Sequence, residues 1–314
     1  MAKYLVTGGA GFIGSNIVKK VLEQGDSVRV VDNFSTGRRE NIEEFLQNPN
    51  FELVEGDLTN LEIAKNAVRG MEFVLHQAAV PSVPRSIEDP ITSNSANVNA
   101  TLNLLVSARD EKVKKVVYAS SSSVYGDNPD LPKKEDFPVR PISPYALTKY
   151  AGERYCQIFW NIYGLPTTCL RYFNVFGPKQ NPFSQYSAVI PKFIDCFLEN
   201  KSPVIFGNGE QSRDFTFVDN VVVANLLAVT SEKGNGEVFN IACNERTSLN
   251  ELVGFLAKIS GKDIAPEYKD ARVGDVLHSQ ADISKIEEFL GFEPIIKFQE
   301  GLKKTFNWYA NQKN

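Results

Sequence analysis

Short runs of apolar and β-branched residues alternate with amphipathic segments along the first half of the chain. These runs have the length of buried strands and cover residues 3–7, 27–31, 51–55, 73–76, 116–119 and 167–171. Helical spacing of apolar residues appears between several of them, in residues 15–24, 94–110 and 144–163. This alternation predicts an α/β fold, a Rossmann-type doubly wound parallel sheet whose ligand crevice lies at the carboxyl ends of the strands.

The pattern becomes less regular after residue 178. Helical spacing recurs in residues 189–199, 220–229, 249–259, 282–290 and 298–310, and short apolar runs predict strands at 204–207, 213–218 and 237–241. We therefore expect a dinucleotide-binding domain over residues 1–178, to which segments near 215–245 return. A smaller α/β substrate-binding domain is expected over residues 179–314.

Composition narrows the class of ligand. The chain has 314 residues, 42% of them hydrophobic, and a formal net charge of -4, which argues against nucleic acid or an anionic membrane as partner. Its two histidines and four scattered cysteines lack the spacing of a metal site or a disulfide framework, so we expect no metal. The first strand runs directly into glycines and no apolar stretch is long enough to cross a membrane, which predicts a cytoplasmic protein.

A glycine loop follows the first predicted strand. Gly8, Gly11 and Gly14 have the spacing G-x-x-G-x-x-G and precede the amphipathic segment 15–24. Without side chains, these positions allow the backbone to approach a pyrophosphate at the N-terminus of a helix. Strand, glycine loop and helix together predict a dinucleotide site.

Asp32 ends the second predicted strand and selects the dinucleotide. A carboxylate at this place accepts hydrogen bonds from an adenosine ribose and repels a 2′-phosphate, so NAD is favoured over NADP. Arg38 and Arg39 weakly favour NADP, although their place in an exposed loop explains their presence equally well.

Later strand ends supply further candidates for the cofactor site. Asp57 follows the third strand and is placed to meet the adenine edge, and Gln77-Ala78-Ala79 gives the chain small residues where it passes the cofactor. One of Asn97 and Asn99 is expected to point toward the cofactor. His76 is expected to pack at the end of its strand rather than to bind a ligand.

The stretch from Ser120 to Lys149 carries the candidate catalytic groups. A run of serines from Ser120 to Ser123 follows the fifth strand, and Tyr145 and Lys149 lie one turn apart on a helix that Ser143-Pro144 opens. At about 5 Å and an effective dielectric of about 20, a phenol and an ammonium attract by about 3 kcal/mol. Such an attraction brings the pKa of a phenol from about 10 to roughly 8. The spacing therefore predicts that Tyr145 is a base near neutral pH.

These motifs together carry a resemblance over essentially the whole chain. The sequence resembles the extended short-chain dehydrogenase/reductase family and, within it, the UDP-hexose 4-epimerases, in the branch that acts on UDP-N-acetylated sugars. The motifs are T-G-G-A-G-F-I-G at residues 7–14, D-N at 32–33, H-Q-A-A at 76–79, S-V-P-R-S at 82–86, S-S-S-V-Y-G at 121–126, S-P-Y-A-L-T-K at 143–149, R-Y-F-N-V-F-G-P at 171–178 and H-S-Q-A-D-I-S-K at 278–285.

The resemblance implies a reversible oxidation at C4 of a UDP-sugar. Ionised Tyr145 removes the proton of the 4-hydroxyl while the hydride passes to NAD, and the resulting 4-keto sugar turns over and takes the hydride back on its other face. By the same resemblance Lys149 holds the nicotinamide ribose, and Ser121 is the hydroxyl partner at the 4-oxygen. Ser123 aligns with a position that also carries a hydroxyl in epimerases.

Residues that are missing from the motifs support the same assignment. Relatives that eliminate water from a sugar nucleotide carry an Asp-Glu pair within the serine run, and the uronate decarboxylases carry a Glu just before Val-Tyr-Gly. In this chain both positions are serine. Reductases of the family need NADPH, which Asp32 disfavours.

The resemblance also extends both binding sites. It adds to the cofactor site Phe12, Ile13, Asn33, Ser35, Thr36, Gly37, Leu58, Tyr172 and Phe173. It assigns to the UDP-sugar Ser82, Ser121, Ser122, Tyr145, Asn174, Ala188, Val189, Ile205, Phe206, Arg213, Arg272, Asp275 and Ser279. In this set Arg213 and Arg272 pair with the pyrophosphate. Ile205 and Phe206 meet the uracil, and Asp275 meets the second ribose.

Ser279 carries most of the information on the sugar. The family has a bulky Tyr there when only plain hexoses are accepted, and a small residue when a 2-acetamido group must fit. Ser279 therefore favours UDP-N-acetylglucosamine and UDP-N-acetylgalactosamine, with UDP-glucose and UDP-galactose also turned over. Pro81 departs from the Gly or Lys that relatives often have near the sugar, and a UDP-glucose or UDP-glucuronate 4-epimerase is the alternative within the same class.

Two further inferences concern partners and the alternative from another class. In relatives, the helices near residues 97–109 and 144–163 pair across a twofold axis, which predicts a homodimer. An NAD-binding regulatory protein without catalysis is the alternative, and the intact set of Tyr145, Lys149 and Ser121 counts against it. A pure scaffold would not need the glycine loop.

Overall fold

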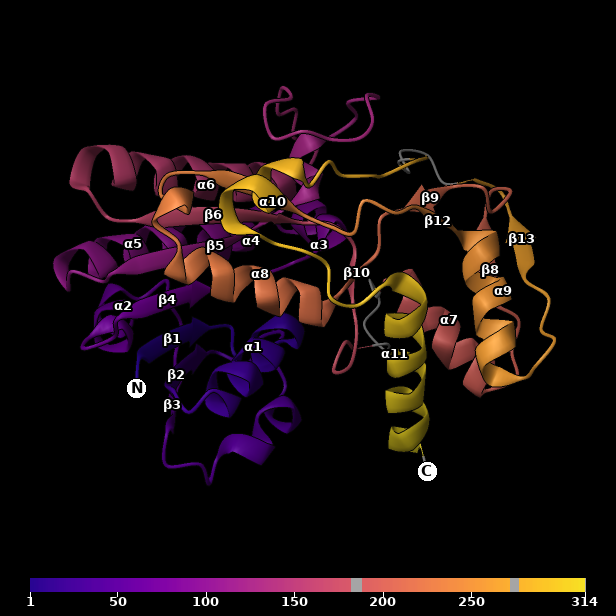
Figure 1. The fold of residues 1–314 in the computed structure, drawn as a ribbon, viewed down its shortest axis with the longest axis horizontal. Helices are drawn as coiled ribbons and strands as arrows, with labels where there is room; N and C mark the ends of the chain where they lie inside the picture. Colours follow the sequence, from indigo (N-terminus) through magenta and orange to yellow (C-terminus); the bar gives the residue numbers. More distant parts are fainter. Residues whose placement is uncertain (182–187, 272–276, 314) are drawn as a thin grey trace.

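A parallel sheet of seven strands forms the centre of the protein (Figure 1). The structure is a computed structural model and describes residues 1–181, 188–271 and 277–313. The strands are β1 (Lys3–Thr7), β2 (Ser27–Asp32), β3 (Phe51–Glu55), β4 (Phe73–His76), β5 (Lys115–Ser121), β6 (Thr167–Tyr172) and β11 (Val238–Ile241). Their order in the sheet is β11-β6-β5-β4-β1-β2-β3, and every neighbouring pair is parallel. The predicted doubly wound sheet is therefore confirmed.

Helices cover both faces of the sheet because neighbouring residues of each strand point to opposite sides. On one face, α1 (Phe12–Glu23) and α8 (Val218–Thr230) pack over a core that contains Val6 and Val30. On the other face, α2 (Leu61–Val68), α5 (Ala100–Asp110) and α6 (Pro144–Tyr163) pack over a core that contains Leu5 and Val31. The strands thus expose only their carboxyl ends to a ligand.

The predicted helix over residues 94–110 is interrupted. α3 (Val83–Glu88) and α4 (Pro90–Asn94) precede a π-helical turn at Ser95–Asn99, and α5 begins only at Ala100. The turn carries Asn97, whose side chain is buried and hydrogen-bonded to residues outside the helix. Polar side chains that bond away from their own helix account for such interruptions, which are frequent at functional sites.

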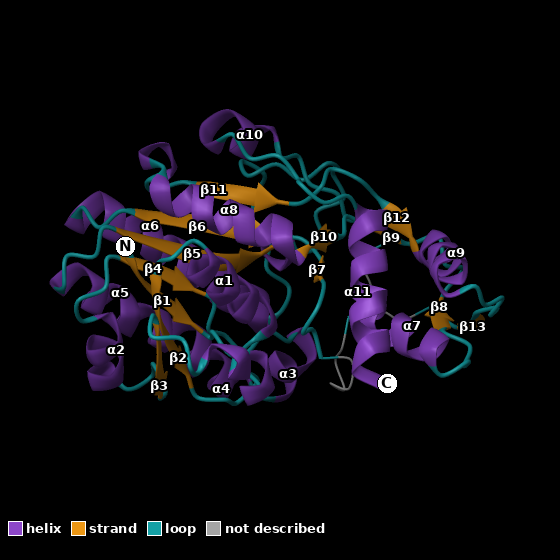
Figure 2. Cartoon of the chain, turned by 60° about the horizontal axis from the view of Figure 1, so that its bottom comes forward, coloured by secondary structure: helices purple, strands orange, loops and turns teal. Residues whose placement is uncertain are grey.

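A second lobe lies beside the carboxyl ends of the strands (Figure 2). It contains α7 (Val189–Leu198), β8 (Val204–Phe206), β9 (Ser212–Arg213), β12 (Thr247–Ser248), α9 (Leu249–Ser260), β13 (Glu267–Lys269) and α11 (Phe298–Lys313). Its own aromatic core includes Phe193, Phe197, Phe217 and Phe298. α10 (Ser284–Leu290) does not belong to this lobe but packs on β11 at the edge of the large sheet.

The predicted strand over residues 213–218 is wrong. The structure has two short strands there: β9, which pairs with β12, and β10 (Thr216–Phe217), which pairs with β7 (Val175–Phe176). Helix α8 follows immediately at Val218. The chain turns at Asp214, whose buried carboxylate accepts backbone hydrogen bonds from Cys243 (3.0 Å) and Ala281 (3.2 Å). These distant amides are a tertiary feature that the local sequence pattern does not contain.

The helices of the described ranges are all too short or too polar to cross a membrane.

Candidate active site

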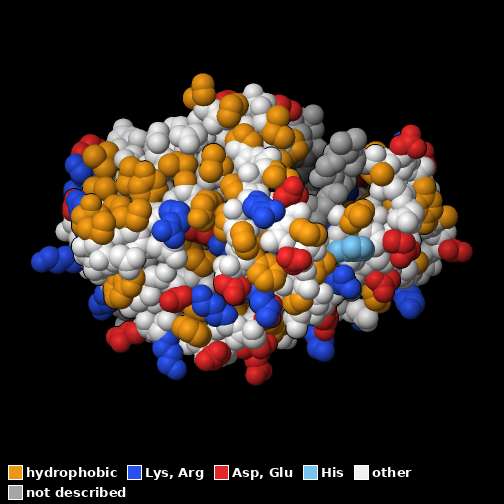
Figure 3. Space-filling view, turned by 90° about the horizontal axis from the view of Figure 1, so that it is seen from above, with side chains coloured by type: hydrophobic (Ala, Val, Ile, Leu, Met, Phe, Trp, Pro, Cys, Tyr) orange, Lys and Arg blue, Asp and Glu red, His pale blue; other side chains and the backbone are white. Residues whose placement is uncertain are grey.

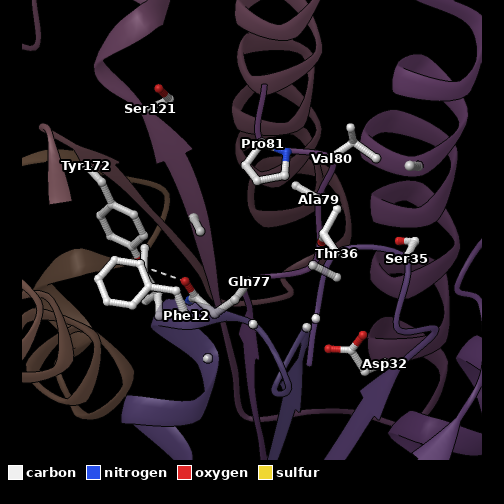
Figure 4. A pocket seen from close by; sticks show the side chains of 18 of the residues that line it. Phe12, Asp32, Ser35, Thr36, Gln77, Ala79, Val80, Pro81, Ser121 and Tyr172 are labelled. Atoms are coloured by element: carbon white, nitrogen blue, oxygen red, sulfur yellow. Dashed lines mark hydrogen bonds between the residues drawn. The ribbon is translucent and has the colours of Figure 1, made fainter. Parts of the chain in front are cut away.

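A cavity of about 540 Å³ runs along the carboxyl ends of the strands. Asp32 lies toward one end of it and Ser121 toward the other, with the Gln77–Ala79 segment between them (Figure 4). Because the carboxyl ends of parallel strands meet at one edge of the sheet, residues far apart in sequence line a single cleft.

The glycine loop forms one wall of this cavity by close backbone packing. Gly8 has a φ of 65°, and a Cβ there would lie 2.8 Å from Cα of Ala78. A side chain at Gly37 would lie 2.8 Å from Oδ1 of Asp32. Helix α1 begins at Phe12 with its first turn on the cavity, where its free amides favour an anion.

Asp32 is held in place by the backbone around it. Its carboxylate accepts hydrogen bonds from the amides of Ala10 and Phe34, each at 2.9 Å. Burial raises the pKa of Asp32, and these two amides act against that rise. The side chain is thereby fixed at the end of β2, where a ribose hydroxyl is expected.

Asp57 and Asn33 form a polar pair beside Asp32. The Asn33 amide donates to Asp57 at 2.8 Å, and the Thr59 backbone amide donates to the other carboxylate oxygen at 2.8 Å. Burial opposes ionisation of Asp57, but these hydrogen bonds outweigh it and lower its pKa. Asp57 is therefore an acceptor at neutral pH on the rim of the cavity.

Asn225, a residue that the sequence analysis missed, orients Tyr172 and Gln77 in the middle of the cavity. Asn225 of α8 is fully buried and donates to the hydroxyl of Tyr172 at 2.8 Å, and its Oδ1 accepts from Gln77 at 3.1 Å. The Tyr172 hydroxyl in turn donates to Gln77 Oε1 at 3.1 Å (Figure 4). A lone polar residue in the apolar run V-V-V-A-N-L-L-A-V was the signal that could have found Asn225.

Tyr145 meets Ser121 at the other end of the cavity. Ser143 caps α6 and Pro144 occupies its first turn, so the helix starts where the sequence predicts and Tyr145 lies in that turn. Burial raises the pKa of Tyr145, and the neighbouring Ser121 side chain acts in the opposite direction. The phenol and the hydroxyl both line this end of the cavity, at the carboxyl end of β5.

Lys149 does not lower the pKa of Tyr145 in the protein alone, contrary to the prediction from their spacing. Its ammonium donates to the carbonyl of Ala119 at 2.8 Å and lies 5.2 Å from the centre of the Tyr118 ring. Burial lowers the pKa of Lys149 to about 8. A backbone carbonyl of β5 thus holds the ammonium in place.

Asn97 links the catalytic helix to the loop after β4. Its Oδ1 accepts from the amide of Val80 at 2.8 Å, and its Nδ2 donates to Thr148 at 3.0 Å. The Thr148 hydroxyl donates to the carbonyl of Tyr145 at 2.7 Å. Asn97 does not line the cavity, so it acts on the site through these neighbours.

Most of the predicted cofactor residues line this one cavity. They are Gly8, Gly11, Phe12, Ile13, Gly14, Asp32, Asn33, Ser35, Thr36, Gly37, Asp57, Leu58, Gln77, Ala78, Ala79, Tyr145, Lys149 and Tyr172. Of the predicted substrate residues, Ser121, Ser122, Asn174 and Ala188 line it as well. Val80, Pro81, Gln180 and Asn181 also line it and were not assigned to either binding site.

Other predicted residues lie away from the cavity. Ser82 caps α3, Val189 begins α7, and Phe206, Arg213 and Ser279 lie farther into the second lobe. Arg213 donates to the carbonyls of Ser212 and Leu277, at 2.9 and 3.0 Å. Arg272 and Asp275 lie outside the described residues.

Three predicted side chains are placed differently from expectation. Ile205 is 0% exposed in the core of the second lobe, and Phe173 is buried in the core of the large sheet, so neither side chain can contact a ligand there. The Ser123 hydroxyl is buried without a hydrogen-bond partner and does not line the cavity, while Ser123 N–H donates to Ser121 Oγ at 3.2 Å. In this arrangement Ser123 orients Ser121.

The cavity fits NAD. The glycine wall has no room for side chains, the first turn of α1 offers amides to a pyrophosphate, and Asp32 and Asp57 offer acceptors to the adenosine half. The opposite end, with Tyr145, Lys149 and Ser121, is placed for the nicotinamide half. A dinucleotide cradle that ends on a Tyr-Lys-Ser set defines a dinucleotide-dependent enzyme of the short-chain dehydrogenase/reductase class.

Comparison with known proteins places the chain more narrowly. The model of the NAD dependent epimerase/dehydratase family matches residues 4–242. A putative UDP-glucose 4-epimerase of Methanocaldococcus jannaschii is 41% identical over 309 residues, which cover 98% of each chain.

Two solved structures share the whole architecture. The UDP-N-acetylglucosamine 4-epimerase of Methanobrevibacter ruminantium in complex with UDP-N-acetylmuramic acid has a TM-score of 0.94 at 41% identity and covers 99% of each chain. The UDP-glucose 4-epimerase of Thermotoga maritima with UDP-glucose also has a TM-score of 0.94, at 40% identity, and covers 99% of this chain and 100% of that one. The chain belongs to the NAD-dependent epimerase/dehydratase family, among the UDP-sugar 4-epimerases, which are isomerases.

Proposed function

We propose that the protein inverts C4 of UDP-N-acetylglucosamine and UDP-N-acetylgalactosamine through a 4-keto intermediate, and that it also acts on UDP-glucose and UDP-galactose. The observation that carries the proposal is that Tyr145, Lys149 and Ser121 line one end of a cavity whose other end fits an adenosine. A phenol and a hydroxyl in this place can hold a sugar hydroxyl and move its proton without releasing the sugar.

The chain's own residues handle the proton and the orientation. When bound, NAD would accept the hydride and return it. Tyr145 takes the proton of the sugar 4-hydroxyl and later returns it, while Ser121 hydrogen-bonds the same oxygen. Lys149 remains fixed on Ala119 and presents its remaining N–H groups to the ribose next to the nicotinamide.

The cavity lining disfavours a uronate as substrate. Among the described residues that line it, Lys149 is the sole cation, and this ammonium already donates to a carbonyl. A C6 carboxylate would therefore lose its hydration without an ionic partner. UDP-glucuronate remains the substrate of the alternative proposal and is included in the test below.

Ser279 supports the acetamido sugars. Its backbone amide donates to the carbonyl of Ser212 at 3.0 Å, which fixes the chain beside Arg213 of β9. The side chain is small, so Ser279 itself would leave room for a 2-acetamido group directed at this part of the second lobe. Binding of the diphosphate by Arg213 and Arg272, and of the second ribose by Asp275, belongs to the same proposal.

Product analysis on three sugar nucleotides tests the proposal. The protein, supplied with NAD, is incubated separately with UDP-N-acetylglucosamine, UDP-glucose and UDP-glucuronate, and the epimers are resolved by anion-exchange chromatography. We expect turnover in the order given. Failure to convert the acetamido sugar overturns the preference, and failure with all three, together with bound NAD, favours the regulatory alternative.

The Tyr145→Phe variant separates catalysis from folding and binding. Loss of the phenol oxygen removes the base but leaves the glycine wall intact, so we expect epimerisation to fall by at least about 100-fold with NAD affinity retained. Full activity in this variant would exclude Tyr145 as the base.

We also propose a homodimer through the outer face of α6. Leu147, Ala151, Tyr155, Ile158 and Ile162 recur at spacings of three and four residues, and Leu147 and Ile162 are 56% and 69% exposed. Apolar side chains gather over this side of the molecule in the view from above (Figure 3). A second copy with the same stripe fits this surface because a twofold axis brings like faces together.

Ile158→Lys should give a monomer by light scattering, whereas Ile295→Lys, also at an exposed apolar residue, should not.

The four thiols support a cytoplasmic location. All four cysteines lie in the described part of the chain and are free. Reduced thiols are usual in that compartment.

A further inference from the structure

A buried carboxylate lies one helical turn beyond Lys149. Glu153 of α6 is 1% exposed and accepts hydrogen bonds from three donors on two strands. The hydroxyl of Ser120 donates to its Oε1 at 2.5 Å, and Arg171 donates Nε to Oε1 and Nη2 to Oε2, each at 2.9 Å. Both oxygens of this buried carboxylate thus accept at least one hydrogen bond, as a buried charge requires.

The partners of Glu153 connect it to the walls of the cavity. Ser120 directly precedes Ser121 on β5, and Arg171 directly precedes Tyr172 on β6. Both of these following residues line the cavity, on strands that pair with each other at this register. The carboxylate therefore joins the catalytic helix to the two strands that carry the hydroxyl partner and a cofactor contact.

The surroundings of Lys149 contain few charges. Its ammonium faces the Tyr118 ring of β5, His76 of β4 and, along its own helix, Tyr145 and Glu153. Burial lowers the pKa of Lys149, and the charge of Glu153 acts against that decrease. His76 is neutral at physiological pH, because burial lowers its pKa to about 3.

The groups that face Glu153 are equally few. Besides Ser120 and Arg171, Tyr118 of β5 and Cys169 of β6 lie within its electrostatic reach. Arg171 also has contacts of its own. Its guanidinium lies 4.7 Å from the centre of the Tyr125 ring and donates to the backbone carbonyl of Glu135 at 3.4 Å. It also attracts the Glu135 carboxylate electrostatically.

We propose that Glu153 is a positioning residue for the epimerase reaction: its hydrogen bonds to Ser120 and Arg171 hold α6 in register with β5 and β6, and they fix a carboxylate one helical turn from the buried Lys149. The inference rests on the proposed function, since Lys149 serves Tyr145 and the cofactor there. Arg171 is the ionic partner that a buried carboxylate requires.

Two substitutions in the Glu153–Arg171 pair make the proposal testable. Glu153→Gln keeps the shape and removes the negative charge, whereas Arg171→Lys keeps the positive charge and disturbs only the geometry of the hydrogen bonds. In NAD-loaded, lysine-labelled protein, the Lys149 ammonium is titrated by NMR, with its signal assigned by its loss in Lys149→Arg. In parallel, kcat/KM is measured from pH 6 to pH 10.

We expect Glu153→Gln to lower the pKa of Lys149 and the alkaline limb of kcat/KM by about one pH unit or more. Arg171→Lys should leave both close to their wild-type positions, although it weakens the bidentate pair. A purely structural role predicts instead that both single variants lose stability without moving the Lys149 titration, or move it in the same direction, and either result overturns the proposal.

Two provisions keep the result decisive. If Glu153→Gln does not fold, the Glu153→Gln/Arg171→Gln double variant decides, because it leaves no unpaired buried charge: a lowered pKa of Lys149 supports the proposal, and an unchanged or raised one overturns it. If the wild-type protein converts none of the three UDP-sugars, the proposed function fails, while the NMR titration still judges the charge relation between Glu153 and Lys149.

Discussion

The side-chain oxygen of Ser86 accepts a hydrogen bond from the backbone N–H of Tyr145 at 3.0 Å. Ser86 is 0% exposed, and its hydroxyl donates to the carbonyl of Val83 at 2.7 Å. The bond satisfies an amide in the first turn of α6, which has no partner within the helix. It also sets the height of Tyr145 relative to Ser121, although Ser86 itself touches neither cofactor nor sugar.

Ser86→Ala should therefore impair catalysis more than its position suggests. The variant leaves a half-buried amide without a partner, which costs about 1 to 3 kcal/mol of unfolding free energy. It also releases the first turn of α6, so we expect kcat to fall about tenfold with little change in NAD affinity. Ser107→Ala is the matched control, because Ser107 is also buried and donates to a helix carbonyl, but lies away from the cavity. Equal effects on kcat in both variants would contradict the positioning role.

Gly37→Ala should weaken NAD binding specifically. The new Cβ would lie 2.8 Å from Oδ1 of Asp32, so the carboxylate has to move from the place where two backbone amides hold it. We expect the Kd for NAD, measured by calorimetry, to rise at least about tenfold with no gain in NADP binding. Gly254→Ala is the control: a Cβ there meets no atom within 4 Å, and the helix should gain up to about 1 kcal/mol. Unchanged NAD affinity in Gly37→Ala would show that Asp32 does not carry the contact.

His76 should make the fold less stable in mild acid. Its ring lies between the hydroxyls of Thr7 (2.7 Å) and Thr101 (2.9 Å), and its pKa is lowered from 6.5 to about 3, first by burial and then by Lys149. The unfolded chain takes up the proton and the folded chain does not. The contribution of His76 is thus complete above pH 6.5 and is lost as the pH falls toward 3.

Urea unfolding between pH 7 and pH 5.5 measures this effect. We expect a loss of about 1 kcal/mol of unfolding free energy in the wild type, because each pH unit below the unfolded pKa costs up to about 1.4 kcal/mol. The loss should disappear in His76→Asn and persist in His278→Asn, since the other histidine of the chain is exposed. A loss of equal size in His76→Asn would assign it to other groups.

Ser279→Tyr should narrow the range of substrates. If the second lobe receives the acetamido group near this residue, a phenol ring there obstructs it and leaves plain hexoses unaffected. We expect kcat/KM for UDP-N-acetylglucosamine to fall at least about tenfold relative to UDP-glucose. Ser279→Ala keeps the side chain small and should retain the wild-type ratio. A constant ratio in both variants would remove Ser279 from the specificity site.

Much of the site could be predicted from the sequence because of where its residues lie in the fold. Asp32, Asp57, Gln77 and Ser121 all stand at or just after the carboxyl end of an apolar run. Once those runs form one parallel sheet, their ends meet at one edge, so local pattern is enough to assemble the cavity. The start of α6 was equally predictable, because Ser143 and Pro144 act within one helical turn of Tyr145.

The second lobe was predicted less well. Residues 213–218 were expected to be one strand, but the structure divides them between two small sheets and places Asp214 at the corner. Ile205 was expected at the uracil and lies in the core instead. In a short strand either face can be the buried one, and the choice depends on partners that are distant in sequence.

The sequence alone thus determined the sheet, the dinucleotide cradle and the Tyr145–Lys149 spacing, because each depends on residues within a few positions of one another. Only the tertiary structure decided where the charges act. It turns Lys149 toward Ala119, brings Tyr145 and Ser121 to the same end of the cavity, and buries Glu153 against Ser120 and Arg171. Burial and hydrogen bonds between distant segments set these relationships, and neither is contained in the spacing of residues along one helix.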